Sequence, residues 1–298
     1  MNKKIFISII SIIMVILTST FVFANFNTAT DKNTKKVVLS KTVNVDEAYV
    51  KEETESFHIE DYIKTCNNYL EVLNITEMRF DSPEIETYKN NTENQTEVII
   101  SDSNMVIKLE KESKEFLSYI HKNTSFKENT LSDEAVKEVA MRLFENLDIF
   151  ENYEMYSLEK FDEELYLARF FKKYDEHLNP GEMICFSFSP EAKEIVSLTK
   201  KSMIFANNDI IVSTSEAHNI ALPYLEKSVA TDMTIELEIV EPNYGLLPEL
   251  DSNCVYQRAD ETRLAYVCKF NNEAKTEVYI DCTTGEIIGA DWIAGGEF

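Results

Sequence analysis

The chain is poor in several residue types on which common catalytic and binding sites depend. Its 298 residues include only six glycines, six prolines, four histidines and one tryptophan. No C-x-x-C, H-E-x-x-H, G-x-S-x-G or Walker pattern occurs, and six glycines leave little material for phosphate-binding loops. The sequence therefore contains no recognisable catalytic motif, and we expect no enzymatic activity and no cofactor.

The four histidines are also too dispersed to suggest a metal site. None of His58, His121, His177 and His218 stands two to five residues from another potential His or Cys ligand. The only compact acid–histidine group is Asp175-Glu176-His177, which precedes Asn179-Pro180-Gly181 and is interpreted as a polar loop. We expect no metal centre.

Positive charge is scarce. The chain has 29 basic and 53 acidic residues, a net charge of −24. This balance excludes nucleic acid as a partner, because phosphates demand a basic footprint. Most of the acidic charge is interpreted as a solvated surface, and association with a basic partner or with cations is the alternative.

One long apolar run lies at the N-terminus. Lys3-Lys4 precedes Ile5–Leu17, and Val22-Phe23-Ala24 has the small-residue chemistry of a cleavage site. Residues 1–24 are either a cleaved signal peptide or a membrane anchor formed by residues 5–23. Both alternatives predict an exported protein of the extracellular space or cell envelope, with the membrane contacted only through this segment.

Residues 25–56 are polar and are predicted to be a linker. Lysines come first and acidic residues follow, a composition that buries too little apolar surface to fold by itself. A tether is the simpler interpretation. The alternative is that the lysines hold anionic lipid or wall polymer beside the membrane.

Five cysteines leave at least one unpaired in an exported chain. A Cys254–Cys268 disulfide is geometrically permissible and is left open. A hairpin loop at Asn271–Ala274 would pair Cys268 with Glu277 and put Cys282 on the opposite face, which disfavours a Cys268–Cys282 bridge. Cys66 and Cys185 are predicted to be buried thiols.

Three segments of the chain resemble one another: Glu110–Ser118, Ser189–Ser197 and Asp281–Gly289. Each has a turn-forming stretch, a glutamate, two apolar residues and a small residue, which indicates a repeated unit. Gly285 suits a left-handed turn, whereas Lys114 and Lys193 at the matching positions imply strain or a different turn type.

The alignment makes two further predictions about equivalent positions. Glu115, Glu194 and Glu286 should occupy the same place in their hairpins. Phe116, Ile195 and Ile287 should lie on the same side of their sheets.

Each similar segment follows an amphipathic stretch. Apolar residues at helical spacing predict helices over 59–73, 133–147 and 215–229, the third with a Ser213–Glu216 capping box and with Pro223 as a kink or early end. Alternating stretches between them predict antiparallel strands. We therefore expect an α+β fold of three tandem units, each one helix packed on a small antiparallel sheet, over residues 57–122, 131–201 and 212–293.

The last unit resembles the PepSY type of repeat. The resemblance rests on Tyr279-Ile280-Asp281-x-x-Thr284-Gly285-Glu286-Ile287-Ile288 and on the upstream strand Arg263–Val267. It covers 212–293 best, then 131–201, then 57–122. PepSY repeats occur in exported peptidase propeptides, in envelope proteins of Gram-positive bacteria and in a spore-germination protein that supports a cortex-lytic enzyme. The resemblance implies a binding or regulatory role and brings no catalytic residue.

The expected function is therefore that of a non-enzymatic exported protein that binds or regulates another exported protein, such as a hydrolase or peptidase. The alternatives are an anchored accessory subunit of a membrane signalling protein and an exported hydrolase without a known motif. The predicted contact surface is the last hairpin, with Tyr279, Glu286 and the single tryptophan, Trp292. Packing at the end of the last strand is the alternative role for Trp292.

Overall fold

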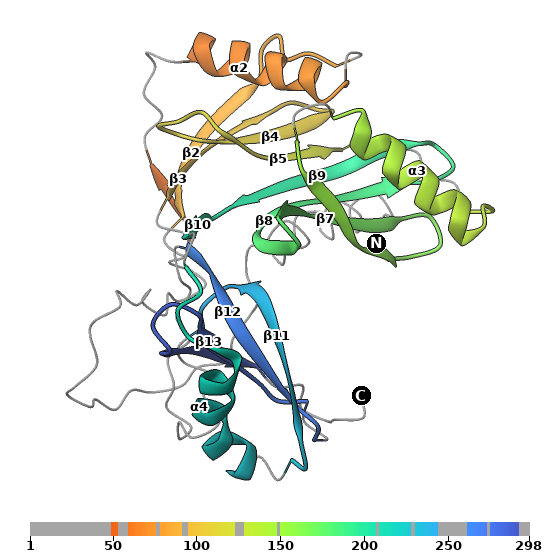
Figure 1. The fold of residues 1–298 in the computed structure, drawn as a ribbon. Helices are drawn as coiled ribbons and strands as arrows, with labels where there is room; N and C mark the ends of the chain where they lie inside the picture. The colour runs from red at the N-terminus through yellow and green to blue at the C-terminus, as the bar shows by residue number, and fades with distance from the viewer. Residues whose placement is uncertain are drawn as a thin grey trace. The chain divides into compact units, whose positions relative to one another are not determined.

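Strands account for most of the regular structure in the computed structural model (Figure 1). The chain divides into two units, of which the first contains residues 49–172 and 183–201 and the second 173–182 and 202–291. The predicted segment 1–24 and all of the predicted linker except 49–52 lie outside the described residues. The structure describes residues 49–52, 59–75, 78–90, 95–122, 128–147, 150–206, 209–227, 230–243, 261–272 and 275–291.

The first unit is built on a nine-stranded sheet of order β1-β2-β3-β4-β5-β9-β8-β7-β6. Two helices accompany it. The elements are β1 (Tyr49–Glu52), α2 (Ile59–Val72), β2 (Glu84–Asn90), β3 (Gln95–Ser101), β4 (Met105–Glu110), β5 (Phe116–His121), α3 (Asp133–Glu145), β6 (Tyr153–Lys160), β7 (Tyr166–Tyr174), β8 (His177–Ser189) and β9 (Glu194–Ser202).

The predicted α+β fold of three helix-on-sheet units is wrong. The described part of the chain is mostly β, and β5 and β9 join the first two predicted units into one sheet. These strands pair antiparallel, with Tyr119 opposite Leu198. Each would otherwise be an exposed edge, and pairing satisfies the backbone N–H and C=O groups of both. Alternation in the sequence marks a strand and its buried face, but it does not reveal which strand lies beside it. Strand β1, which pairs with β2, also lies within the predicted linker.

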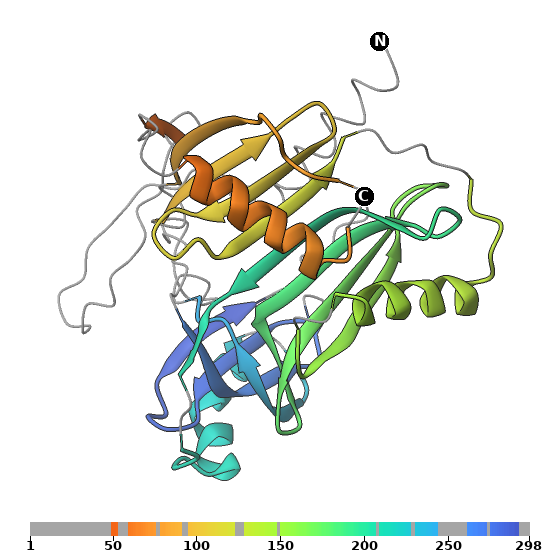
Figure 2. The ribbon, with the colours of Figure 1, turned by 90° about the horizontal axis from the view of Figure 1, so that it is seen from above.

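Both helices pack on one face of the large sheet (Figure 2). Helix α2 buries Tyr62, Cys66 and Leu70, which are spaced four residues apart along one stripe. Helix α3 begins after Ser132, whose side chain accepts a hydrogen bond from the backbone N–H of Ala135.

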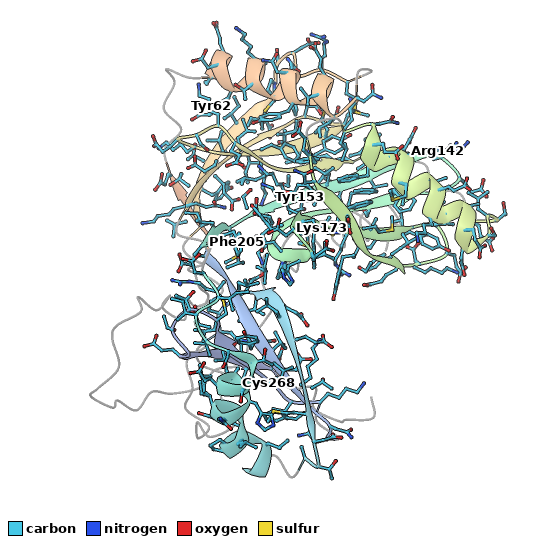
Figure 3. All side chains as sticks on the ribbon, viewed as in Figure 1. Tyr62, Arg142, Tyr153, Lys173, Phe205 and Cys268 are labelled. Carbon is cyan, nitrogen blue, oxygen red and sulfur yellow. The ribbon has the colours of Figure 1, made fainter. Side chains whose placement is uncertain are left out.

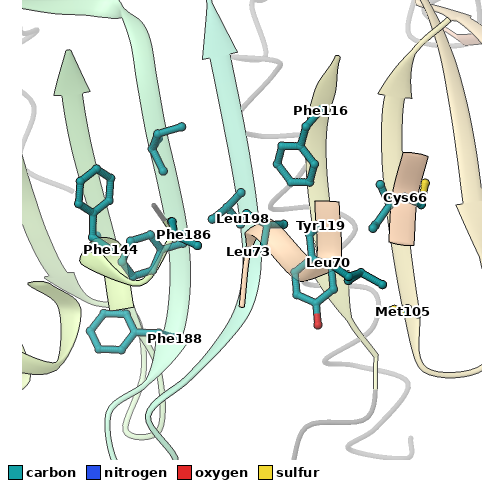
Figure 4. Packing of buried hydrophobic residues seen from close by; sticks show 14 of the residues in the cluster. Cys66, Leu70, Leu73, Met105, Phe116, Tyr119, Phe144, Phe186, Phe188 and Leu198 are labelled. Carbon is teal, nitrogen blue, oxygen red and sulfur yellow. The ribbon is translucent and has the colours of Figure 1, made fainter. Parts of the chain in front are cut away.

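The core beneath the two helices is rich in aromatic rings. Phe144 of α3 stacks on Phe170 of β7 with ring centroids 3.9 Å apart, and Phe170 is followed by Phe186 at 5.7 Å. On the other side, Tyr69 of α2 contacts Phe116 at 5.5 Å. One continuous apolar cluster therefore joins α2, α3 and the sheet (Figure 4).

The second unit contains a five-stranded sheet and one helix. Strands β11, β12, β13 and β14 form an antiparallel meander, and β10 pairs parallel with the start of β12. The elements are β10 (Ile204–Ala206), α4 (Thr214–Lys227), β11 (Met233–Val240), β12 (Glu261–Phe270), β13 (Glu277–Asp281) and β14 (Ile287–Asp291).

The core of the second unit lies between α4 and the sheet. Ala217 and Ala221 of α4 pack against a cluster that includes Cys268 of β12 (Figure 3). The predicted capping box is confirmed: the N–H of Ser213 donates to Glu216 Oε2 at 2.8 Å, and the N–H of Glu216 donates to Ser213 Oγ at 3.3 Å. Helix α4 continues through Pro223 to Lys227.

The tip of the β7–β8 hairpin, residues 173–182, belongs to the second unit. The ring of Tyr174 lies 4.7 Å from that of Phe205, and the N–H of Met203 donates to Gly181 O at 2.9 Å. The stretch Asn179-Pro180-Gly181, predicted as a polar link between strands, is part of β8. The turn lies earlier, at Asp175-Glu176, where Asp175 has a φ of 51°.

Candidate partner-binding surface

The predicted contact surface centres on the turn between β13 and β14, residues 281–286. The N–H of Gly285 donates to Asp281 O, and the N–H of Asp281 donates to Glu286 O, each at 2.9 Å. The carboxylate of Asp281 also accepts from the N–H groups of Thr283 and Thr284 at 2.8 and 2.9 Å. Gly285 has a φ of 72°, a left-handed conformation that glycine adopts without steric cost.

The same turn geometry occurs at the two other similar segments. Lys114 and Lys193 have φ values of 57° and 56°, and their N–H groups donate to Glu110 O and Ser189 O across the same span as in the Asp281–Gly285 turn. The two lysines are therefore held in a conformation that costs an L-residue about 1 kcal/mol. Of the two alternatives left open by the sequence, the structure shows the same left-handed turn rather than a different turn type.

Strand register extends the correspondence between the first and third of these turns. Leu109 pairs with Phe116 and Ile280 with Ile287, and a register shift precedes both pairs. Phe116, Ile195 and Ile287 each pack against the apolar cluster that contains a helix of their own unit, as predicted. Glu115, Glu194 and Glu286 each follow the left-handed residue of their turn.

The predicted contact residues have different surroundings. Glu286 is exposed in the turn. Tyr279 is half-buried in β13, where it packs against a small cluster on the sheet that includes Val267 and Ile288. Trp292 lies outside the described residues, so its role stays a prediction.

A segment that the sequence analysis did not select packs against this turn. The N–H groups of Ile211 and Val212 both donate to Cys282 O at 2.9 Å. In the opposite direction, the hydroxyl of Thr283 donates to Asp209 O at 2.6 Å. Residues 209–212 are therefore clamped to the turn just before α4 begins.

Further contacts hold the end of this segment. The hydroxyl of Tyr266 donates to Val212 O at 2.8 Å. A Cβ atom at Gly285 would lie 3.4 Å from Val212 Cγ2, so the turn and the segment are in van der Waals contact. The short apolar run Ile210-Ile211-Val212 thus has one half-buried member, Val212, which faces the turn.

Ile210 and Ile211 face solvent. Their exposed fractions are 56% and 69%, although the backbone beneath Ile211 is fixed by hydrogen bonds. We call residues 209–212 together with 281–286 the isoleucine platform. A signal for it was present in the sequence: three consecutive β-branched apolar residues stand directly before the capping residue Ser213 and belong to no predicted helix or strand.

The rim of the isoleucine platform is acidic. Asp209, Glu216 and Glu286 are exposed. Hydrogen bonds from the Ser213 N–H and hydroxyl lower the pKa of Glu216, which keeps this carboxylate ionised at neutral pH. Neither 202–226 nor 276–298 contains a lysine or arginine, and the basic group that does reach the platform, the Arg263 guanidinium, lies 3.6 Å from Asp281 Oδ2. The platform therefore combines exposed apolar surface with negative charge.

The described cysteines are poor nucleophiles. Cys66, Cys185, Cys268 and Cys282 are all buried free thiols. Burial raises the pKa of Cys66 and Cys268 to about 12 and that of Cys185 to about 11, so none of these three forms a thiolate at neutral pH. Within the described ranges, no three His, Cys, Asp or Glu residues are grouped as metal ligands.

The structure also corrects the reasoning about disulfides. Cys268 pairs with Val278 rather than Glu277, and Cys268 and Cys282 belong to the same apolar cluster rather than to opposite faces. The hairpin register is one residue away from the predicted one because the N–H of Phe270 donates to Thr276 O, which lengthens the connection. Cys254, the proposed partner of Cys268, lies outside the described residues.

Comparisons with known proteins found similarity among the solved structures. No family model and no curated protein matches the chain. A solved structure similar to it is the YpeB C-terminal domain of Bacillus megaterium, with a TM-score of 0.44 and 12% sequence identity, covering 79% of this chain and 97% of that chain. Among the helices in the described part of the chain, none has the length and apolar character needed to cross a bilayer.

Proposed function

We propose that this is a non-enzymatic exported protein of the cell envelope that acts by binding another exported protein. The observation that carries the proposal is the pair Ile210 and Ile211, which are exposed on a backbone fixed by hydrogen bonds. Ordered apolar side chains in solvent are typical of contact surfaces, because a partner can bury them without first ordering the chain.

Two further observations support this proposal. The N-terminal sequence has the pattern of an export signal, with Lys3-Lys4 before Ile5–Leu17. The described thiols, the most nucleophilic side chains available, are buried, and burial keeps Cys66 protonated. An exported hydrolase or peptidase is the partner class that we propose, since the PepSY resemblance implies such partners.

The proposal is tested by site-specific crosslinking in the cells that produce the protein. A photoreactive amino acid at position 211 should give a covalent product with a second exported protein. The matched control carries the same residue at position 59, an isoleucine of the first unit that is 38% exposed, and should not give that product.

Two results would count against the proposal. One is the absence of any crosslinked protein from position 211 and from the neighbouring positions 210 and 284. The other is turnover of a peptide or glycan substrate by the purified chain that disappears when a single side chain is replaced.

A further inference from the structure

We infer that the isoleucine platform binds an extended partner segment in which apolar side chains are flanked by lysine or arginine. This inference rests on the proposed function and specifies the chemistry of its partner. It follows from the rigidity, the apolar surface and the charge of the platform.

The backbone of the platform is ordered before any partner binds. Four hydrogen bonds hold residues 209–212 in place. The N–H groups of Ile211 and Val212 donate to Cys282 O, and the hydroxyls of Thr283 and Tyr266 donate to Asp209 O and Val212 O. Because this backbone is already ordered, binding costs little conformational entropy on this side of the interface.

The apolar area sets the size of the contact. Ile210 and Ile211 are adjacent residues that are each more than half exposed. Two neighbouring β-branched side chains offer contact to a short run of apolar groups on a partner chain, rather than to a large surface. The flanking residues Thr283 and Thr284 of the turn give this contact a polar border.

The negative charge of the platform determines which residues should flank the apolar side chains of the partner segment. Three exposed carboxylates belong to the platform and to the first turn of α4, those of Asp209, Glu216 and Glu286. The basic side chain that reaches the platform, Arg263, is already paired with Asp281 and Glu261. Opposite charge on a partner accelerates its encounter with this surface and fixes its position there. Like charge repels.

The same charge argument separates the possible occupants. A second copy of this chain carries a net charge of −24, and an anionic lipid surface is also negative. The acidic rim repels both as whole bodies. The exception is residues 35–41 of a second copy, Lys-Lys-Val-Val-Leu-Ser-Lys, which have the chemistry of the proposed segment and are tested by the sedimentation experiment below. A basic segment of another protein is attracted.

The inference is tested by selecting binders from a random-peptide display library on the full chain. We expect the selected peptides to contain two or more adjacent apolar residues with lysine or arginine beside them. Their affinity should fall as salt concentration rises, because the charges are exposed.

Variants then locate the binding site. Replacing both isoleucines (Ile210→Asn with Ile211→Asn) should weaken the selected peptides by about a hundredfold, roughly tenfold for each isoleucine side chain replaced. Glu286→Lys, which leaves the isoleucines in place, should weaken the same peptides and flatten their salt dependence. Ile59→Asn is the matched control and should change neither quantity.

Three outcomes overturn the inference: a selection that yields no peptide, peptides without basic residues, or binding that survives both Glu286→Lys and the isoleucine variants. Self-association in sedimentation experiments that the isoleucine variants abolish would identify a second copy as the occupant, which also overturns it. If the exported protein that crosslinks to position 211 still binds those variants, the proposed function stands and only this inference fails.

Discussion

At the scale of single residues, the three similar turns show how one backbone geometry is formed by different side chains. Gly285 adopts its left-handed conformation freely, whereas Lys114 and Lys193 do so at a cost. Lys114 has local compensation, because its ammonium lies 5.4 Å from the centre of the Tyr62 ring and 3.5 Å from a carboxylate oxygen of Asp61. Lys193 is exposed.

These differences predict that substitutions at Gly285 and Lys193 change the free energy of unfolding differently. Gly285→Ala should lower the free energy of unfolding by about 1 kcal/mol, since a Cβ at this φ is strained. Lys193→Gly should leave it unchanged or raise it, because relief of strain offsets the greater entropy of glycine in the unfolded chain. Urea denaturation measures both. A stabilising Gly285→Ala would mean that the turn is not left-handed.

Asn243 takes the place of a neighbouring strand beside β14. Its side-chain amide donates to Ala290 O at 2.9 Å, and its carbonyl oxygen accepts from the Ala290 N–H at 2.8 Å. A Cβ at Gly289 would lie 2.1 Å from the Asn243 side chain, so only glycine fits there. The edge of β14 is therefore covered at this point.

Removal of that amide should destabilise the second unit. Asn243→Ala leaves two buried backbone groups of Ala290 without partners and should cost about 2–4 kcal/mol. Asn243→Asp is the informative companion, since a carboxylate keeps the acceptor and loses the donor. Thermal unfolding of both variants provides the measurement, and a loss below about 0.5 kcal/mol for Asn243→Ala would show that the edge is not covered in this way.

The raised pKa of Glu277 makes the stability of the fold depend on pH. Burial, followed by the charges of Glu238, Asp291 and Glu236, raises its pKa, although Lys269 acts in the opposite direction. The folded state therefore binds this proton more tightly than the unfolded state, so stability falls as pH rises from the ordinary value of 4.5 through the raised one. Glu277→Gln should increase the stability at pH 7, and the difference should vanish below pH 4.5. An increase that persists unchanged in acid would rule out titration as the cause.

At the scale of elements, the pairing of β5 with β9 is the feature that turns two predicted sheets into one. The register places Ser118, Tyr119 and Ile120 opposite Thr199, Leu198 and Ser197. Both strands are therefore interior to the nine-stranded sheet, whose outer strands are β1 and β6.

Hydrogen exchange distinguishes one continuous nine-stranded sheet from two separate sheets. We expect amides of β5 and β9 that point toward each other to be as protected as those of β4 and β8, because exchange requires opening of the sheet. Outward-pointing amides of β6 should exchange much faster. Rapid exchange of the facing amides in β5 and β9 would restore the picture of separate sheets.

At the scale of the whole molecule, the two larger apolar clusters among the described residues share no residue. One contains Phe186 and lies under α2 and α3, and the other contains Val278 and lies under α4. Each core belongs to one of the two units.

Calorimetry should therefore resolve two unfolding transitions. Phe186→Ala should lower the temperature of one, with a loss of about 3–5 kcal/mol, and leave the other in place. Val278→Ala should affect only the second transition, by a smaller amount because fewer buried atoms are removed. If both substitutions shift a single common transition, the two units fold as one.

The sequence by itself determined the features that depend on local interactions. Helical spacing placed α2, α3 and α4 within two residues of their observed ends, and Ser213 with Glu216 identified the start of α4. The likeness of the segments at Glu110, Ser189 and Asp281 identified turns with a common backbone geometry. Such features follow from neighbours a few residues apart, whose contacts are set by the period of the helix or the hydrogen bonds of the turn.

Only the tertiary structure decided which distant segments meet. The pairing of β5 with β9, the assignment of the β7–β8 tip to the second unit and the clamp between Asp209 and Thr283 each join residues far apart in the chain. Apolar alternation shows that a strand has a buried face, yet every strand of this kind offers the same backbone groups to any neighbour. For the same reason Ile210 and Ile211 resemble ordinary core residues in the sequence, and only the tertiary structure shows that they lie in solvent.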